Sequence, residues 1–159
     1  MSDDARQRWF LSSAERGNTS TRIDTNHEGG LAWTTGNEVE VLVHGATYFR
    51  RLHDELCALE RGDRCYFTDW RGDADQLLLT GGPTIRDLLC ELAKKGVEIR
   101  GLVWRSHSDL LSFSSKENDK FGKEINHSGG EVLLDQRVKR FGSHHQKLFI
   151  VRQIGRAHV

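Results

Sequence analysis

The chain of 159 residues has the length of one ordinary domain, and 36% of its residues are hydrophobic, which is enough for a buried core. Lysine plus arginine and aspartate plus glutamate number 23 each, so no overall basic field draws the chain towards nucleic acid or anionic lipid. The cysteines at positions 57, 65 and 90 are odd in number and lack the close spacing of zinc ligands, which argues against a disulfide framework and a zinc site.

Residues 1–36 are polar and show no sustained hydrophobic period, which predicts an extended N-terminal arm with at most a short helix at residues 3–12. Residues 1–17 are too polar for the apolar segment of a secretory signal. The sequence also contains nothing close to the roughly 18 consecutive apolar residues that a spanning helix needs. We therefore expect a cytoplasmic protein, and peripheral association with a membrane stays open.

From residue 37 onward, the hydrophobic pattern predicts strands that alternate with helices. Alternating valines predict a strand at residues 39–43, and apolar residues at helical spacing predict a helix at residues 47–60. A short aromatic stretch predicts a buried strand at residues 65–68, and a loop follows at residues 72–82.

The next helix carries the clearest start and stop signals of the chain. Thr84 and Asp87 form a capping-box pattern, an apolar stripe follows, and Gly96 ends the helix. Further strands are predicted at three places, with one irregular helix in the polar stretch 106–130: residues 97–104, 131–135 and 145–151.

Alternating strands and helices predict an α/β domain, a layered α/β/α sandwich with a mixed, largely parallel sheet. In such sheets, ligands bind beyond the carboxyl ends of the parallel strands. We therefore expect one cleft lined by the residues at those ends. Taken singly, each tryptophan among them is better explained as a cap of the core, and each arginine as a solvated side chain. The residues are His44 and Gly45; Asp69, Trp70 and Arg71; and Trp104, Arg105, Ser106 and His107.

The run from Gly142 to Val151 places His145 and Lys147 two residues apart at the start of an apolar, strand-like stretch. In a strand, residues i and i+2 point to the same face, so the two side chains would project together as a nucleophile or base beside a fixed positive charge. That pair suits phosphate chemistry. His144 would point to the opposite face, where we expect a structural or hydrogen-bonding role. A metal site at the two histidines is disfavoured because adjacent strand residues point apart and no acidic or cysteine cluster with ligand spacing lies close by.

The His-x-Lys spacing, preceded by Ser-His and followed by Leu-Phe-Ile-Val, resembles the signature of the phospholipase D superfamily, which reads His-x-Lys-x4-Asp. His145 and Lys147 match two of its three named residues, and Arg152 stands in the place of the aspartate. The order of predicted elements over roughly residues 30–152 also resembles that of actinobacterial-type phospholipase D-like proteins. In that branch the acidic residue can lie farther downstream.

This resemblance implies a phosphodiester hydrolase or phosphatidyltransferase that acts on phospholipids in two steps, without a cofactor or a metal. His145 would attack phosphorus to form a phosphohistidine, while Lys147 would hold the non-bridging oxygens. A histidine from a second motif would protonate the leaving alcohol. Two alternatives stay open: a nuclease of the same superfamily, and a catalytically silent scaffold, which Arg152 favours.

The expected partner is a phospholipid or another phosphodiester, and no stable nucleic acid partner is expected. Full-length members of the superfamily contain two such domains, so we expect this chain to be an incomplete first half. By itself it would show little or no activity. A second copy could supply another His145 and Lys147 across a two-fold axis.

The last residues, Ile154 to Val159, resemble the translation of a common sequencing adapter. We therefore expect an arm at residues 1–36, a truncated phospholipase D-like domain at residues 37–152 and a non-native tail at residues 153–159. A genuine but unusual C-terminus is the alternative.

Overall fold

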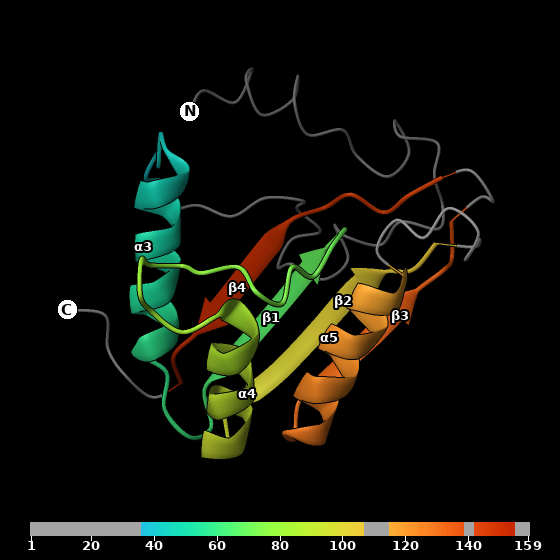
Figure 1. Cartoon of the computed structure of the whole chain (residues 1–159). Helices are drawn as coiled ribbons and strands as arrows, with labels where there is room; N and C mark the ends of the chain where they lie inside the picture. Colours follow the sequence, from blue (N-terminus) through green and yellow to red (C-terminus); the bar gives the residue numbers. More distant parts are fainter. Residues whose placement is uncertain (1–35, 107–114, 139–141, 155–159) are drawn as a thin grey trace, which may run out of the picture. The chain divides into compact units, whose positions relative to one another are not determined.

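The computed structural model describes residues 36–106, 115–138 and 142–154 (Figure 1). The chain divides into two units, residues 1–41 and residues 42–159, and all the helices and strands below belong to the second. The predicted N-terminal arm and the predicted tail lie almost wholly outside the described residues, so both stay predictions. In the described part of the chain, no helix combines the length and the apolar character needed to cross a bilayer.

The second unit is an α/β structure built on one four-stranded sheet with the strand order β3-β2-β1-β4. β1 pairs in parallel with β2, and β2 in parallel with β3, whereas β4 runs antiparallel to β1. The predicted α/β class with a mixed, largely parallel sheet is therefore confirmed. The elements are α3 (Gly45–Cys57), β1 (Arg64–Asp69), α4 (Ile85–Lys95), β2 (Glu98–Trp104), α5 (Ser115–His127), β3 (Glu131–Asp135) and β4 (Leu148–Arg152).

α4 begins and ends at the predicted capping residues. The Thr84 hydroxyl accepts a hydrogen bond from the backbone N–H of Asp87 at 3.1 Å and donates one to the Asp87 carboxylate at 2.7 Å. Gly96 ends the helix with φ of 94°, a left-handed conformation that glycine adopts without a steric penalty. Between the caps, an apolar stripe faces the core: Ile85, Leu88, Leu89, Leu92 and Ala93.

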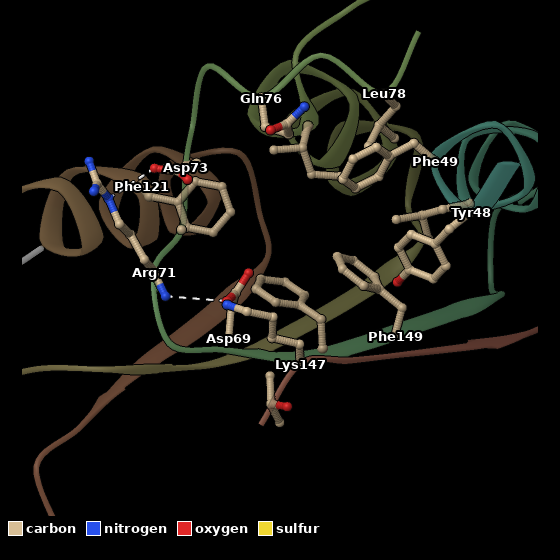
Figure 2. A pocket seen from close by; sticks show the side chains of 15 residues that line it. Tyr48, Phe49, Asp69, Arg71, Asp73, Gln76, Leu78, Phe121, Lys147 and Phe149 are labelled. Atoms are coloured by element: carbon tan, nitrogen blue, oxygen red, sulfur yellow. Dashed lines mark hydrogen bonds and ion pairs between the residues drawn. The ribbon is translucent and has the colours of Figure 1, made fainter. Parts of the chain in front are cut away.

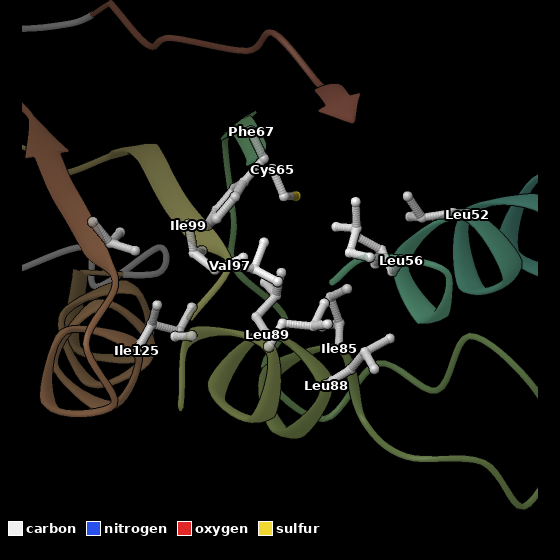
Figure 3. Close-up of a cluster of buried hydrophobic side chains, with 14 of the residues drawn as sticks. Leu52, Leu56, Cys65, Phe67, Ile85, Leu88, Leu89, Val97, Ile99 and Ile125 are labelled. Atoms are coloured by element: carbon white, nitrogen blue, oxygen red, sulfur yellow. The ribbon is translucent and has the colours of Figure 1, made fainter. Parts of the chain in front are cut away.

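The core lies between the three helices and one face of the sheet (Figure 3). Cys65 and Phe67 of β1 and Ile99 of β2 point into it and meet leucines of α3 and α4. Burial raises the pKa of the Cys65 thiol to about 12, so this cysteine is an inert core residue. On the opposite face of the sheet, Leu133 is 57% exposed. The second helical layer of the predicted sandwich is not among the described residues.

The strand predicted at residues 39–43 is wrong. Residues 36–43 form neither helix nor strand, and Val39 and Val41 are 83% and 80% exposed. Alternating valines indicate that the backbone favours an extended conformation, but a strand also needs a neighbour that accepts its hydrogen bonds. Within the described ranges, no strand pairs with these residues.

β4 begins at Leu148, three residues later than predicted. Its ladder with β1 starts at the pair Thr68 and Leu148, because β1 ends at Asp69 and offers no further partner. Residues 142–147, just before β4, therefore belong to neither a helix nor the sheet. Since β4 runs antiparallel to β1, its first residues lie beside the carboxyl end of β1, the edge at which α/β sheets bind ligands.

Candidate active site at the carboxyl end of β1

The indole ring of Trp70 brings His145 and Lys147 together. Trp70 directly follows β1, and its ring centre lies 5.2 Å from the centre of the His145 ring, with the two planes tilted by 52°. The Lys147 ammonium nitrogen lies 5.8 Å from the centre of the same indole, within the range of a cation–π contact. The two residues singled out in the sequence thus flank one aromatic side chain.

The side chain of Trp104 packs against that of Trp70. The two indole rings stack with their centres 5.9 Å apart and their planes inclined by 13°. Trp104 is the last residue of β2 and is buried, so its position is set by the sheet. Both tryptophans were expected at a shared cleft or as caps of the core. They stack on each other at the strand ends, and neither lines the cavity beside Lys147 and Asp69.

Asn118, a buried residue of α5, ties the ends of β1 and β2 to each other. Its side-chain amide nitrogen donates hydrogen bonds to the carbonyl oxygens of Trp70 at 3.1 Å and Trp104 at 2.7 Å. Its amide oxygen accepts a hydrogen bond from the N–H of Gly72 at 2.8 Å. One side chain therefore satisfies three backbone groups where the chain leaves the sheet. The polar sequence around Asn118 carried no signal of this role.

Lys147 forms an ion pair with Asp69, the last residue of β1, with 2.9 Å between the ammonium nitrogen and Oδ1. The side chains are 56% and 27% exposed, so solvent screens the pair in part. Sequence reasoning missed this pairing because it depends on the antiparallel register of β1 and β4. Arg152 occupies the place of the signature's aspartate, at the opposite end of β4 and in register with Arg64.

His144 lies apart from this cluster, beside Asp135 at the end of β3. Its Nδ1 atom is 4.0 Å from Asp135 Oδ2, too long for a hydrogen bond, and both side chains are largely buried. The backbone N–H of Arg137, followed by the Arg137 side chain and the charge of His144, lowers the pKa of Asp135. Among the described residues, the buried Nδ1 atom of His144 has no hydrogen-bond partner, so the structural or hydrogen-bonding role expected for His144 stays a prediction.

The other residues expected to line the cleft have different surroundings. The Arg71 guanidinium is paired with Asp73 at 2.9 Å and with Glu117 at 2.8 Å, so two carboxylates already compensate its charge. His44 caps the start of α3 without a side-chain hydrogen bond and does not line the cavity described next. His107 lies outside the described residues.

A cavity of about 220 Å³ opens beside the Lys147 and Asp69 pair (Figure 2). It lies on the helix-covered side of the sheet, and Tyr48 and Phe49 of α3 contribute to its wall. Burial, together with the nearby Asp69 carboxylate, raises the pKa of Tyr48, so its phenol remains neutral around pH 7. The lining residues are Tyr48, Phe49, Leu52, Phe67, Thr68, Asp69, Arg71, Gly72, Asp73, Gln76, Leu78, Ile85, Phe121, Lys147 and Phe149.

Among the described residues, no three histidine, cysteine or acidic side chains are grouped as metal ligands would be. No protein-family model matches the chain, and a search of curated proteins found no match. The resemblance to phospholipase D therefore rests on the motif and on the order of elements from α3 onward, because the strand expected at residues 39–43 is not formed. The grouping of His145 and Lys147 around Trp70 is independent information about the site.

Proposed function

We propose that this chain carries the nucleophilic half of a phospholipase D-type active site, which hydrolyses or transfers phosphodiesters of phospholipids. The observation that carries the proposal is the grouping of His145 and Lys147 around Trp70 at the carboxyl end of β1. An imidazole and an ammonium group at a strand end form a minimal site for attack on a phosphate. The exposed position of both side chains leaves them accessible to a substrate.

In the first step, a neutral His145 imidazole attacks phosphorus. A bond forms between an imidazole nitrogen and phosphorus as the bond to the leaving alcohol oxygen breaks, which leaves a phosphohistidine. Lys147 stabilises the charge on the non-bridging oxygens as it develops. The leaving oxygen needs a proton from a second acid, which the resemblance assigns to the histidine of a second motif.

In the second step, water or another alcohol attacks the phosphohistidine and releases His145. The second histidine, now neutral, takes the proton of the attacking hydroxyl, so both imidazoles return to their starting state. Water gives hydrolysis, and an alcohol gives transfer. A second copy of this chain, or further sequence, would supply that second histidine, so the isolated chain is expected to turn over slowly or not at all.

The phospholipase D signature has an aspartate at the position of Arg152. In this chain, Asp69 supplies a carboxylate to the lysine instead. Its contact with Lys147 at 2.9 Å holds the ammonium group beside Trp70 before a substrate arrives. The silent-scaffold alternative drew its support from Arg152, and a carboxylate from another strand at the lysine weakens that support.

The test compares wild type, His145→Asn and the matched control His127→Asn, which changes an exposed histidine at the end of α5. Each is prepared as the 159-residue chain and as the longest reading frame that contains it. Because removal of a covalent nucleophile abolishes the main pathway, we expect His145→Asn in the longer reading frame to lose at least about a thousandfold in turnover of phosphatidylcholine, with the control unchanged.

Bis(4-nitrophenyl) phosphate and single-stranded DNA serve as parallel substrates in this assay. Faster turnover of phosphatidylcholine than of DNA supports an enzyme that acts on phospholipids. Faster turnover of DNA would favour the nuclease alternative instead. In the longer reading frame, equal and negligible turnover by wild type and His145→Asn on every substrate would contradict the proposal.

A further inference from the structure

We propose that His53 and Cys57 of α3 bind a zinc ion, with water in the remaining coordination positions. Neither residue lines the cavity beside Lys147, and the inference is independent of the proposed function. The spacing of the three cysteines gave no sign of such a site, because the second ligand is a histidine.

His53 and Cys57 lie on the same side of α3. They are four residues apart in a helix that spans Gly45–Cys57, so one turn separates them and their side chains are neighbours. The Sγ atom of Cys57 lies 3.5 Å from Nε2 of His53 and 4.0 Å from Nδ1. The cysteine is exposed and the histidine side chain is 20% exposed, so an ion from solvent can reach both.

The distance between the two donor atoms matches the edge of a zinc tetrahedron. Bonds of roughly 2.3 Å to sulfur and roughly 2.05 Å to nitrogen, at the tetrahedral angle, place these atoms about 3.6 Å apart. A linear two-coordinate ion with the same bond lengths would hold them roughly 4.3 Å apart. The 3.5 Å between Sγ and Nε2 therefore fits zinc better than a linear ion. The ring is attached through a soft torsion, so a small rotation aims Nε2 at the ion.

Asp54 favours the tautomer of His53 that zinc requires. Its Oδ1 atom lies 3.2 Å from Nδ1 of the histidine. A carboxylate beside one ring nitrogen holds the proton there, which leaves the lone pair of Nε2 free for a metal. Histidines that bind zinc usually have such a partner on their other ring nitrogen. This contact is separate from the one between His53 and Cys57, and it also points to a cation.

The same three side chains could instead act as a nucleophile, a base and an orienting carboxylate, but two observations argue against this. Burial, followed by the charge of Asp54, raises the pKa of the Cys57 thiol, so the thiol is protonated at neutral pH and is a poor nucleophile. An acyl-transfer site also needs free hydrogen-bond donors for an oxyanion, and the N–H groups around Cys57 are bonded within the helix. A metal ion needs no such donors and displaces the thiol proton.

The surrounding charges also suit a cation. Asp54 and Glu91 place negative charge near the thiol, and the opposing charge of Lys95 is held at the carbonyl oxygen of Leu59, to which its ammonium group donates at 2.6 Å. Among the described residues, no third histidine, cysteine or acidic side chain completes a metal-binding group. Water therefore takes the other positions, and we expect weaker binding than at a structural zinc site with four protein ligands.

The experiment uses cobalt(II) as the spectroscopic probe and zinc(II) as the competitor, on the reduced 159-residue chain without an affinity tag. Four-coordinate cobalt absorbs strongly in the visible range, and a bond between cobalt and a thiolate adds a charge-transfer band in the near ultraviolet. Hydrated cobalt shows neither signal. We expect both signals with the wild type, and we expect both to disappear as zinc displaces cobalt, because a thiolate and an imidazole in a tetrahedral site select zinc.

Cys57→Ser should abolish the charge-transfer band, and His53→Asn should weaken the binding of both metals at least about tenfold, because it removes one of two protein ligands. Asp54→Asn keeps both ligands and should weaken zinc binding by about tenfold, because Nδ1 loses its carboxylate. Cys90→Ser is the matched control, since it removes a partly exposed cysteine of α4 and should leave both signals unchanged. Circular dichroism checks that the variants remain folded.

A wild-type chain without the charge-transfer band would overturn the proposal, and this result does not depend on any variant. A band that persists in Cys57→Ser, or that Cys90→Ser removes, would overturn it as well, because another thiol would then be the ligand. Failure of zinc to displace cobalt would overturn the choice of metal. All these signals come from the bound metal, so they are separate from phosphodiester turnover and from the test of His145.

Discussion

Asn118 sets the geometry of a site whose functional side chains it does not itself contact. It binds the carbonyl groups of Trp70 and Trp104 and the N–H of Gly72, all from a fully buried position. These bonds fix the direction in which the chain leaves β1, and hence the ring that His145 and Lys147 flank. A buried amide that satisfies several backbone groups is costly to remove, because each group it leaves behind is then unpaired.

Asn118→Ala should therefore lower the free energy of unfolding by about 1–3 kcal/mol or more. Urea unfolding followed by circular dichroism measures this, with Lys120→Ala on the exposed side of α5 as the control. Tryptophan fluorescence should also shift in the folded variant, because the stacking of Trp70 and Trp104 loses its anchor. Unchanged stability and fluorescence would show that the hydrogen bonds of Asn118 do not hold the site.

At this scale, the sequence predicted the residues whose signal is local and missed those whose role depends on packing. The proximity of His145 and Lys147 could be predicted because their spacing and apolar flank lie within ten residues, and their catalytic role stays a proposal. Asp69 could not be matched to Lys147 without knowing that β4 pairs antiparallel with β1. Asn118 had no signal at all, since an asparagine in a polar stretch is normally solvated.

At the scale of elements, local capping chemistry accounts for α4 and the register accounts for β4. The bounds of α4 followed from Thr84 and Gly96, whose preferences act within one turn. The start of β4 depends on where β1 ends, a tertiary fact that the apolar run from Leu148 does not contain. The strand predicted at residues 39–43 was wrong for the same reason, because an alternating pattern of valines cannot show whether a partner strand exists.

Thr84→Ala should cost about 1 kcal/mol of stability at neutral pH through the lost N-cap. The hydrogen bond from Thr84 is the largest cause that lowers the pKa of Asp87 below its usual 3.8. A lowered folded-state pKa means that this stabilisation is present above the unfolded pKa and is lost as pH falls through the folded one. The difference between wild type and variant should therefore narrow below about pH 4.

Thermal unfolding at neutral pH and at low pH measures this effect, and Thr80→Ala in the exposed loop before α4 is the control. A stability difference between wild type and Thr84→Ala that stays constant with pH would contradict the role of the Asp87 carboxylate in this cap.

In the whole molecule, the residues that stabilise the fold and the residues proposed for the chemistry lie in different parts of the sheet. The buried leucines and Phe67 lie between the sheet and the helices, whereas His145 and Lys147 lie at the edge where β1 ends. The net charge is zero, so binding of a phosphate depends on local groups and not on a general basic surface. The sheet could be predicted from the succession of strand-like and helix-like segments. The cavity could not, because packing alone brings its lining together from α3, β1, the loop after β1, α4, α5 and residues 147–149.

The location of the covalent intermediate shows whether His145 is the nucleophile. The protein is mixed with bis(4-nitrophenyl) phosphate, quenched at alkaline pH, at which phosphohistidine survives, and mapped by peptide mass spectrometry. The first chemical step needs only the nucleophile and an activated leaving group, so we expect a phosphoryl adduct on His145 and none on His144. An adduct on His144, or no adduct while nitrophenol is released, would contradict it.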